Sequence, residues 1–236
     1  MEKEGLIQKV KDRHGCYRCL EKECEEIDWL NAPDKTIDLK WPFGIERYVR
    51  ILPRNTICIA GEPDSGKTAV ILNFIKLNMG SHDIHFFSSE MGPIELRDRL
   101  KHFDIPREEW CFHAKERSSN FGDVILPDAV NCIDYLEMHD EFYKVGGHIK
   151  EIYDRLKTGV AIIALQKNRG TPYGLGGMRG LEKPRLYLSM EPGKIRIIKA
   201  KNWVDFKRNP NGLELDFKLI KGCEFIAETD WHKGEG

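Results

Sequence analysis

The sequence predicts an α/β protein with a mainly parallel central sheet, which antiparallel strands extend at the C-terminal end. Three observations support this prediction. Between Thr56 and Leu165, short apolar runs alternate with helical segments, the pattern of parallel strands covered by helices on both faces. After Arg185, three strand-like runs follow one another without a helix between them. A glycine-containing motif from Gly61 to Thr68 stands directly between the first of these strands and the first helix.

The composition fits one large domain with a small additional element. The chain has 236 residues, of which 41% are hydrophobic and 32% charged, and its net charge is −1. This composition can build a core but excludes a general basic coat for nucleic acid. No apolar run approaches the roughly 18–20 residues of a membrane span, and the first residues lack the apolar core of a signal peptide. We therefore expect no membrane partner. The seven cysteines are an odd number, so we expect a reducing cytoplasm and no disulfide framework.

Residues 1–50 are expected to form an N-terminal helical or linker segment, and residues 51–236 the main domain. The segment is charged, looks helical over Glu4–Lys11 and Leu20–Leu30, and ends in a proline-interrupted lead-in. Four of its side chains could ligate zinc: His14, Cys16, Cys19 and Cys24. A single C-x₂-C without a second pair is weak evidence, so a charged helix with half-buried cysteines is the favoured interpretation.

Local patterns predict the elements of the main domain in order. Apolar runs predict strands at residues 56–60, 83–89, 129–134 and 160–165. Apolar positions at helical spacing and a proline in the first turn predict helices over Lys67–Asn78, Pro93–Phe103 and His148–Lys157. The antiparallel extension is expected to comprise residues 185–190, 194–203 and 213–220, with a hairpin signal at residues 209–212.

The motif that follows the first strand is predicted to bind nucleotide phosphates. It reads Gly61-Glu62-Pro63-Asp64-Ser65-Gly66-Lys67-Thr68-Ala69 and satisfies G-x-x-x-x-G-K-[ST]. Glycine lets the backbone curl so that N–H groups converge on phosphate oxygens, and the helix N-terminus adds partial positive charge. Lys67 would supply a full charge to the β- and γ-phosphates, the Thr68 hydroxyl would bind Mg²⁺, and Asp64 is expected to point outward. A plain turn is the alternative, but the strand–loop–helix context favours ATP and Mg²⁺ as cofactors.

Polar residues at the ends of three further strands are candidates for the rest of a hydrolytic site. Asp134 closes an apolar strand, as expected of the acid that holds Mg²⁺, with Glu137 and Asp140 as lesser rivals. Glu90 follows another strand and is a candidate base, although a lone glutamate there is more often a helix-start charge. Gln166 stands at a strand tip, where it would report γ-phosphate to the next loop.

The glycine-rich loop from Asn168 to Lys183 carries several basic residues. Two interpretations are open. The loop is either a floppy surface segment or a mobile element that closes on a polyanion backbone when nucleotide is bound.

The order of these motifs resembles the RecA-like ATPase domain of DnaB-type replicative helicases. The likeness rests on GEPDSGKT, SSEM, IDYLE, LKTGVAIIALQKNRG and IIKAKNW, spread over about Ile51–Leu219. The resemblance implies a RecA-like P-loop NTPase fold with Glu90 as catalytic base, Asp134 as the Walker B acid and Gln166 as γ-phosphate sensor. It also implies a homo-oligomeric ring, typically a hexamer, that hydrolyses ATP and translocates on single-stranded DNA, with a primase or loader as a further partner.

The resemblance also implies residues that act between subunits. Each subunit of the family inserts a lysine and an arginine into its neighbour's nucleotide site. The matching stretch is Lys201-Asn202-Trp203, so a tryptophan stands where the family has the arginine. The available cations are Lys199, Lys201, Lys207 and Arg208, of which Lys201 is favoured.

Two loops that face the ring centre in the family correspond to residues 142–148 and 167–183. They supply these candidate DNA contacts: Lys144, Lys167, Arg169, Arg179 and Lys183. Tyr143 would either stack on a base or pack on the following helix.

Two departures from the family keep alternatives to a helicase open. The loop after the fourth motif reads GLEKPRLYLSM in place of an acidic stretch, and the usual N-terminal helical domain is missing before residue 51. One alternative is a RecA-fold recombination or loading factor that does not unwind DNA. Another is a nucleotide-gated assembly module with little hydrolysis. The compact chain is typical of a phage or mobile-element protein, in the cytoplasm of a bacterial or phage-infected cell.

Overall fold

The computed structural model describes residues 7–10, 14–20, 24, 26–137 and 142–234, and the chain divides into two compact units, residues 1–34 and 35–236. The first unit contains the antiparallel strands β1 (Ile7–Lys9) and β2 (Tyr17–Cys19). Gly15, with φ of 74°, lies in the turn between them. The helix expected over Glu4–Lys11 is therefore wrong for Ile7–Lys9, and the described residues of Leu20–Leu30 contain no helix. Isolated helices as short as the two that we expected here are only marginally stable in water unless they bury an apolar face, which explains why the prediction failed.

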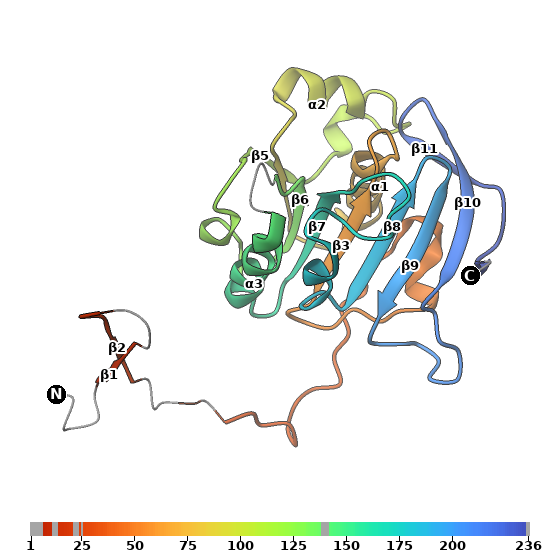
Figure 1. Ribbon diagram of the computed structural model, residues 1–236. Coiled ribbons are helices and arrows are strands. Elements are labelled where there is room, and N and C mark those ends of the chain that lie inside the picture. The colour runs from red at the N-terminus through yellow and green to blue at the C-terminus, as the bar shows by residue number, and fades with distance from the viewer. Residues whose placement is uncertain (1–6, 11–13, 21–23, 25, 138–141, 235–236) are drawn as a thin grey trace. The chain divides into compact units, whose positions relative to one another are not determined.

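The second unit is built on one mixed sheet (Figure 1) in the order β11-β10-β9-β8-β3-β7-β6-β4-β5, with β12 paired to β10. Its strands are β3 (Thr56–Gly61), β4 (Ile84–Ser88), β5 (His113–Glu116), β6 (Val130–Asp134), β7 (Val160–Gln166), β8 (Leu186–Glu191), β9 (Lys194–Ala200), β10 (Leu213–Ile220), β11 (Glu224–Ala227) and β12 (His232–Lys233). Its helices are α1 (Lys67–Asn78), α2 (Pro93–Leu100) and α3 (Val145–Arg155), with short 3₁₀ turns η1 (Pro42–Arg47), η2 (Arg107–Glu109), η3 (Phe121–Asp123), η4 (Phe142–Lys144) and η5 (Gly177–Leu181).

The pairing confirms the predicted fold class, a parallel centre with antiparallel C-terminal strands. Strands β5, β4, β6, β7, β3 and β8 run parallel, and β9, β10 and β11 continue the sheet antiparallel. One detail differs, because β8 pairs parallel with β3 and so belongs to the parallel part. Strand β5 escapes prediction because its sequence, HAKE, has no apolar alternation and all four residues are exposed.

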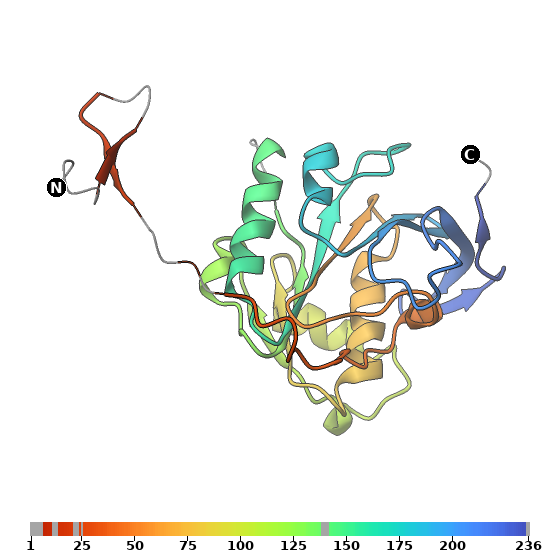
Figure 2. The ribbon, with the colours of Figure 1, turned by 90° about the horizontal axis from the view of Figure 1, so that it is seen from below.

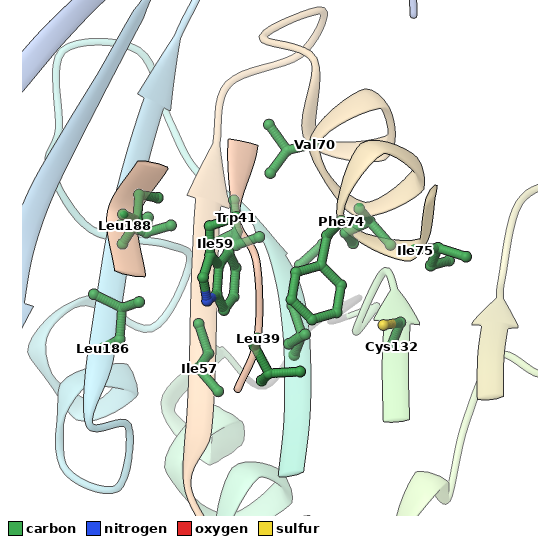
Figure 3. Packing of buried hydrophobic residues seen from close by; sticks show 14 of the residues in the cluster. Leu39, Trp41, Ile57, Ile59, Val70, Phe74, Ile75, Cys132, Leu186 and Leu188 are labelled. Carbon is green, nitrogen blue, oxygen red and sulfur yellow. The ribbon is translucent and has the colours of Figure 1, made fainter. Parts of the chain in front are cut away.

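Helices α1 and α3 cover opposite faces of the sheet (Figure 2). On the α1 face, Phe74 and Val70 pack against Ile57 and Ile59 of β3, and the Trp41 ring lies 4.6 Å from the Phe74 ring (Figure 3). Trp41 belongs to the lead-in before β3, whose apolar side chains Leu39, Ile45, Val49 and Ile51 are also buried in this core. Residues 35–50 are thus part of the main unit, and the boundary lies after residue 34 instead of residue 50.

The α3 face buries Val145, Ile149 and Ile152 against β3, β7 and β8. The helix begins at Val145, three residues before the predicted start at His148. All seven cysteines lie in described residues, and Cys58, Cys132 and Cys223 are buried free thiols. Burial raises the pKa of the Cys58 and Cys132 thiols, which keeps them protonated and unreactive. Across the described ranges, no helix is both long and apolar enough to span a membrane.

Candidate nucleotide site

Four parallel strands end side by side at one edge of the sheet, which we call the carboxyl edge. They are β3, β7, β6 and β4, which are neighbours in that order (Figure 1). In their register Gly61 pairs with Gln166, and Ser88 pairs with Asp134. The fold therefore brings together the ends of the four strands that the sequence marked as functional.

The loop after β3 has the close backbone packing of a phosphate cradle. A Cβ atom on Gly61 would lie 2.4 Å from Ser65 Oγ and 2.6 Å from Lys67 Cγ, so a side chain there would displace the loop. Gly66 is the N-cap of α1 and has a φ of 89°, a conformation that favours glycine. Ser65 Oγ is buried without a hydrogen-bond partner among the described residues, and a phosphate oxygen in the cradle would satisfy it. Asp64 is exposed, as predicted.

The Lys67 ammonium lies over this loop. Its Nζ donates to the carbonyl oxygens of Gly61 at 3.1 Å and Glu62 at 2.9 Å. Burial lowers the Lys67 pKa, and the carboxylates of Asp134, Glu90 and Asp64 oppose that change. Because both acceptors are neutral carbonyls, a phosphate would compete well for this ammonium.

Thr68 and Asp134 together supply oxygen donors suited to Mg²⁺. The Thr68 hydroxyl donates to the Asp134 carboxylate. Asp134 is buried, with only 3% of its surface exposed. Burial raises the pKa of Asp134 to about 6, the Glu90 carboxylate adds to the rise, and Thr68, Lys67 and Arg99 oppose it. A buried acid with a raised pKa between two cations and a second acid is typical of a functional site.

Glu90 is exposed in the loop after β4, next to Asp134. Backbone bonds hold this loop to the end of β6: the Ser89 N–H donates to the Asp134 carbonyl at 3.0 Å, and the Tyr135 N–H to Ser89 Oγ at 3.3 Å. The Glu90 charge influences the pKa values of Lys67, Asp134 and Tyr135. Of the lesser rivals of Asp134, Glu137 lies three residues beyond it, and Asp140 lies outside the described residues.

Lys167 is placed differently from the prediction of a DNA contact. Its side chain is fully buried, and Nζ donates to Ser189 Oγ at 2.9 Å and Glu191 Oε1 at 3.0 Å, with Glu62 Oε1 at 4.0 Å. The Gly170 N–H donates to Glu62 Oε1 at 3.2 Å. The lysine therefore joins the phosphate loop, β8 and the start of the glycine-rich loop instead of facing solvent.

The two loops predicted to face the ring centre lie against each other. The Arg179 Nη1 donates to the Tyr143 carbonyl at 3.2 Å, and the Lys144 ammonium lies 5.9 Å from the Tyr143 ring. The Tyr143 side chain is 55% exposed. Arg169 is exposed, whereas Lys183 covers the Tyr153 ring of α3 at 4.3 Å.

The candidate cations for a neighbouring subunit lie at the opposite edge, which we call the amino edge. Strand β9 runs antiparallel to β8, so its last residue, Ala200, pairs with Leu186 beside Ile57 at the start of β3. Along β3, the rise from Ile57 to Gly61 is about 13 Å, at about 3.3 Å per residue. The candidate cations that follow Ala200 therefore lie about 13 Å or more from Gly61. Lys201, Lys207 and Arg208 are exposed there, and Arg208 pairs with Asp205 at 3.6 Å.

Lys199 and Trp203 have local partners at this edge. The Lys199 ammonium donates to the Leu181 carbonyl, and burial lowers its pKa. The Trp203 indole N–H donates to the Ala200 carbonyl at 2.8 Å, and its ring packs on the α1-face core. Trp203 therefore has a packing role at the position where helicases of the resembled family carry arginine.

The N-terminal zinc ligands do not converge. The described residues contain one group of three or more His, Cys, Asp or Glu side chains with ligand atoms within 4.8 Å of one another, and it excludes His14, Cys16, Cys19 and Cys24. All three of these cysteines are exposed.

A hollow lies beside α2 and is separate from the phosphate loop. It has a volume of about 1010 Å³ and is lined mainly by apolar residues of α2, β4 and the segment before β5. Its rim includes Ser88 and Met91, which flank the Glu90 loop. It is thus a neighbour of the site, and its lining contains no residue of the phosphate loop.

Solved structures resemble this chain, although no protein-family model and no curated protein matches its sequence. A KaiC-like protein from the archaeon Pyrococcus horikoshii OT3 superposes with a TM-score of 0.64 at 14% identity, covering 84% of this chain and 100% of that one. The RadB recombinase gives 0.53 at 13%, covering 78% and 92%. A DnaB-like replicative helicase, described with its interactions with primase, gives 0.52 at 15%, covering 74% and 57%. The chain therefore has the fold of RecA-like ATPases.

Proposed function

We propose that the chain is a Mg²⁺-dependent ATPase of the DnaB-like helicase type, which forms a ring and translocates on single-stranded DNA. The observation that carries this proposal is the convergence of Lys67, Thr68, Asp134 and Glu90 at the carboxyl edge of a RecA-like sheet. A phosphate cradle alone would indicate only nucleotide binding. The two acids beside it supply what hydrolysis additionally requires.

Each residue has a defined task in this proposal. Lys67 and the backbone N–H groups of the loop bind the phosphates, and Thr68 and Asp134 hold the metal. Mg²⁺, when bound, supplies positive charge that neutralises the phosphate oxygens. Glu90 orients the attacking water and accepts its proton. The orphaned Ser65 hydroxyl and the absence of room for a side chain at Gly61 support the fit of the phosphates.

A path of hydrogen bonds supports communication from the nucleotide to the glycine-rich loop. The Lys167 N–H donates to the Gly61 carbonyl at 3.0 Å, and the Leu175 N–H donates to the Gln166 carbonyl at 2.8 Å. Gln166 thus stands between the phosphate loop and the loop that carries Arg169 and Arg179. Movement of Gln166 on nucleotide binding would be transmitted to these arginines, which we propose contact DNA together with Lys144 and Lys183.

The position of the amino-edge cations supports a homo-oligomer. Lys201 and Arg208 lie about 13 Å or more along the sheet from their own phosphate loop, so they could complete only the site of another copy. A ring, typically a hexamer, provides that neighbour to every subunit. We include a primase or loader among the partners by analogy with the structurally similar helicase.

A second candidate is a recombination or loading factor that hydrolyses ATP without unwinding. The superposition covers 92% of the RadB recombinase chain but only 57% of the DnaB-like helicase chain, and this difference favours the second candidate. Trp203 in place of the helicase arginine also supports it.

One set of assays separates these functions. We expect ATP turnover by the wild type to rise with single-stranded DNA, and the rise to disappear in Arg169→Ala/Arg179→Ala. The control is Lys150→Ala, an exposed α3 lysine paired with Asp154, which should keep the stimulation. Strand displacement supports the helicase, whereas stimulation without displacement supports the second candidate. A wild type without turnover would contradict both and favour a nucleotide-gated assembly module.

A further inference from the structure

Three side chains with metal-binding chemistry meet at the amino edge, on the side of the sheet remote from the nucleotide site. His85 is the second residue of β4, and its register partner His113 is the first residue of the edge strand β5. Asp83 immediately precedes β4, and its carbonyl accepts the Val130 N–H at 3.0 Å, which fixes it to β6. The three residues therefore occupy positions set by the sheet itself.

Their ligand atoms have the separations of a coordination shell. His85 Nε2 lies 3.1 Å and His113 Nε2 3.7 Å from Asp83 Oδ1. Two donors bonded to tetrahedral zinc at about 2.0–2.1 Å lie roughly 3.3 Å from each other. The observed distances fall on either side of that value, and all three ligand atoms lie within 4.8 Å of one another.

The nitrogen of His85 that faces the cluster is Nε2, which lies beside Asp83. His85 Nδ1 is buried without a hydrogen-bond partner among the described residues, so Nε2 is the nitrogen available to an ion between these side chains. The rings of His85 and His113 stack with centroids 4.7 Å apart and planes at 19°, so both imidazoles are aligned at the same end of the strands. The side chains of Asp83 and His113 are 62% and 65% exposed, which gives an ion from solvent access to the group.

We propose that Asp83, His85 and His113 bind one divalent transition-metal ion, with zinc as the reference ion. Two imidazoles and a carboxylate suit zinc and its first-row neighbours, whereas Mg²⁺ prefers oxygen ligands. Three protein ligands leave a coordination position for water or a further donor. The ion would tie the exposed edge strand β5 to β4 and stabilise a sheet edge that is otherwise paired on one side only.

The test uses the full chain carrying Cys16→Ser, Cys19→Ser and Cys24→Ser, which removes the N-terminal thiols as competing ligands. Equilibrium dialysis should give one Zn²⁺ per chain, and Zn²⁺ but not Mg²⁺ should raise Tm in the absence of nucleotide. In this background His113→Ala and Asp83→Asn should each weaken Zn²⁺ binding by at least about tenfold. Both side chains are exposed, so the apo fold is retained.

The matched control is His148→Ala, which removes a partly exposed histidine that pairs with Glu151 on α3 and should leave Zn²⁺ binding unchanged. Failure of the triple-serine chain to bind Zn²⁺ would overturn the proposal. So would Zn²⁺ binding that survives both His113→Ala and Asp83→Asn. Mg²⁺-dependent ATP turnover is expected to be equal in all these variants, so the outcome is independent of the nucleotide site.

Discussion

The carboxyl edge and the amino edge of the central sheet carry different chemistry. At the carboxyl edge, Lys67 and Asp134 are drawn into the protein beside backbone N–H groups and carbonyls. At the amino edge, Lys201 and Arg208 are exposed and lie about 13 Å or more along the sheet from their own phosphate loop. The difference shows that strand direction determines which side chains gather at each edge: one edge carries the proposed nucleotide site, and the other carries the cations that we propose act on a second copy.

The largest effect should come from the carboxyl edge. We predict that Lys67→Ala lowers ATP turnover by about 10³-fold or more, because the phosphates lose the full charge nearest to them. Steady-state phosphate release measures this effect. Lys76→Ala, an exposed lysine on the same helix, is the control and should keep wild-type turnover. Undiminished turnover in Lys67→Ala would remove the nucleotide site from this edge.

The amino edge should matter only between copies. We predict that Lys201→Ala lowers turnover about 10–100-fold, because the neighbouring site loses a cation. A mixture of Lys201→Ala and Lys67→Ala chains should be more active than either variant alone, since one supplies the phosphate loop and the other the lysine. No gain on mixing would exclude Lys201 as the trans-acting residue. Lys218→Ala, which removes an exposed β10 lysine paired with Glu228, is the control and should leave turnover unchanged.

Lys167 should affect stability more than DNA binding. We predict that Lys167→Met lowers the free energy of unfolding by about 2–3 kcal/mol, because Glu62 and Ser189 lose their buried partner. The value is below that of a fully buried pair because the Glu191 side chain is 45% exposed. Urea denaturation measures it, with Lys183→Met, at a half-buried lysine without a buried carboxylate partner among the described residues, as the comparison. Equal stability of the two variants would contradict the structural role of Lys167.

The smallest effect is a pH dependence set by Asp134. Its pKa of about 6 exceeds the roughly 3.9 of an unfolded aspartate, so the native state binds the proton more tightly. The stabilising contribution is fully present below about pH 4 and is lost as pH rises through 6. Without nucleotide, the wild type should therefore lose stability relative to Asp134→Asn between pH 4 and 6. Mg²⁺–ATP affinity should fall about tenfold per pH unit below 6, and a flat profile would contradict this pKa.

The strand tips of the carboxyl edge could be predicted from the sequence because their signals are local. An apolar run followed by a polar residue marks the end of a parallel strand, and parallel strands place such ends together. Asp134, Gln166 and the P-loop were predictable on that basis. Glu90 needed the resemblance to a family as well, since a lone glutamate after a strand has a more ordinary explanation.

The features that sequence could not predict depend on distant partners. Lys167 is buried because Ser189 and Glu191, more than 20 residues away, receive its ammonium. The lead-in before β3 belongs to the core because Trp41 meets Phe74 across the fold. The His85–His113 pair requires β5, whose exposed HAKE sequence gives no strand signal.

Hydrolysis at the carboxyl edge is tested most directly by single-turnover release of γ-phosphate from Glu90→Gln, with nucleotide affinity measured on the same sample. Glu137→Gln, which changes the lesser candidate for the role of Asp134, is the control and should behave as wild type. We predict that Glu90→Gln slows release by about 10²-fold or more while nucleotide affinity stays within a few-fold of wild type. Release at the wild-type rate in Glu90→Gln would contradict a hydrolytic site built on Lys67, Asp134 and Glu90.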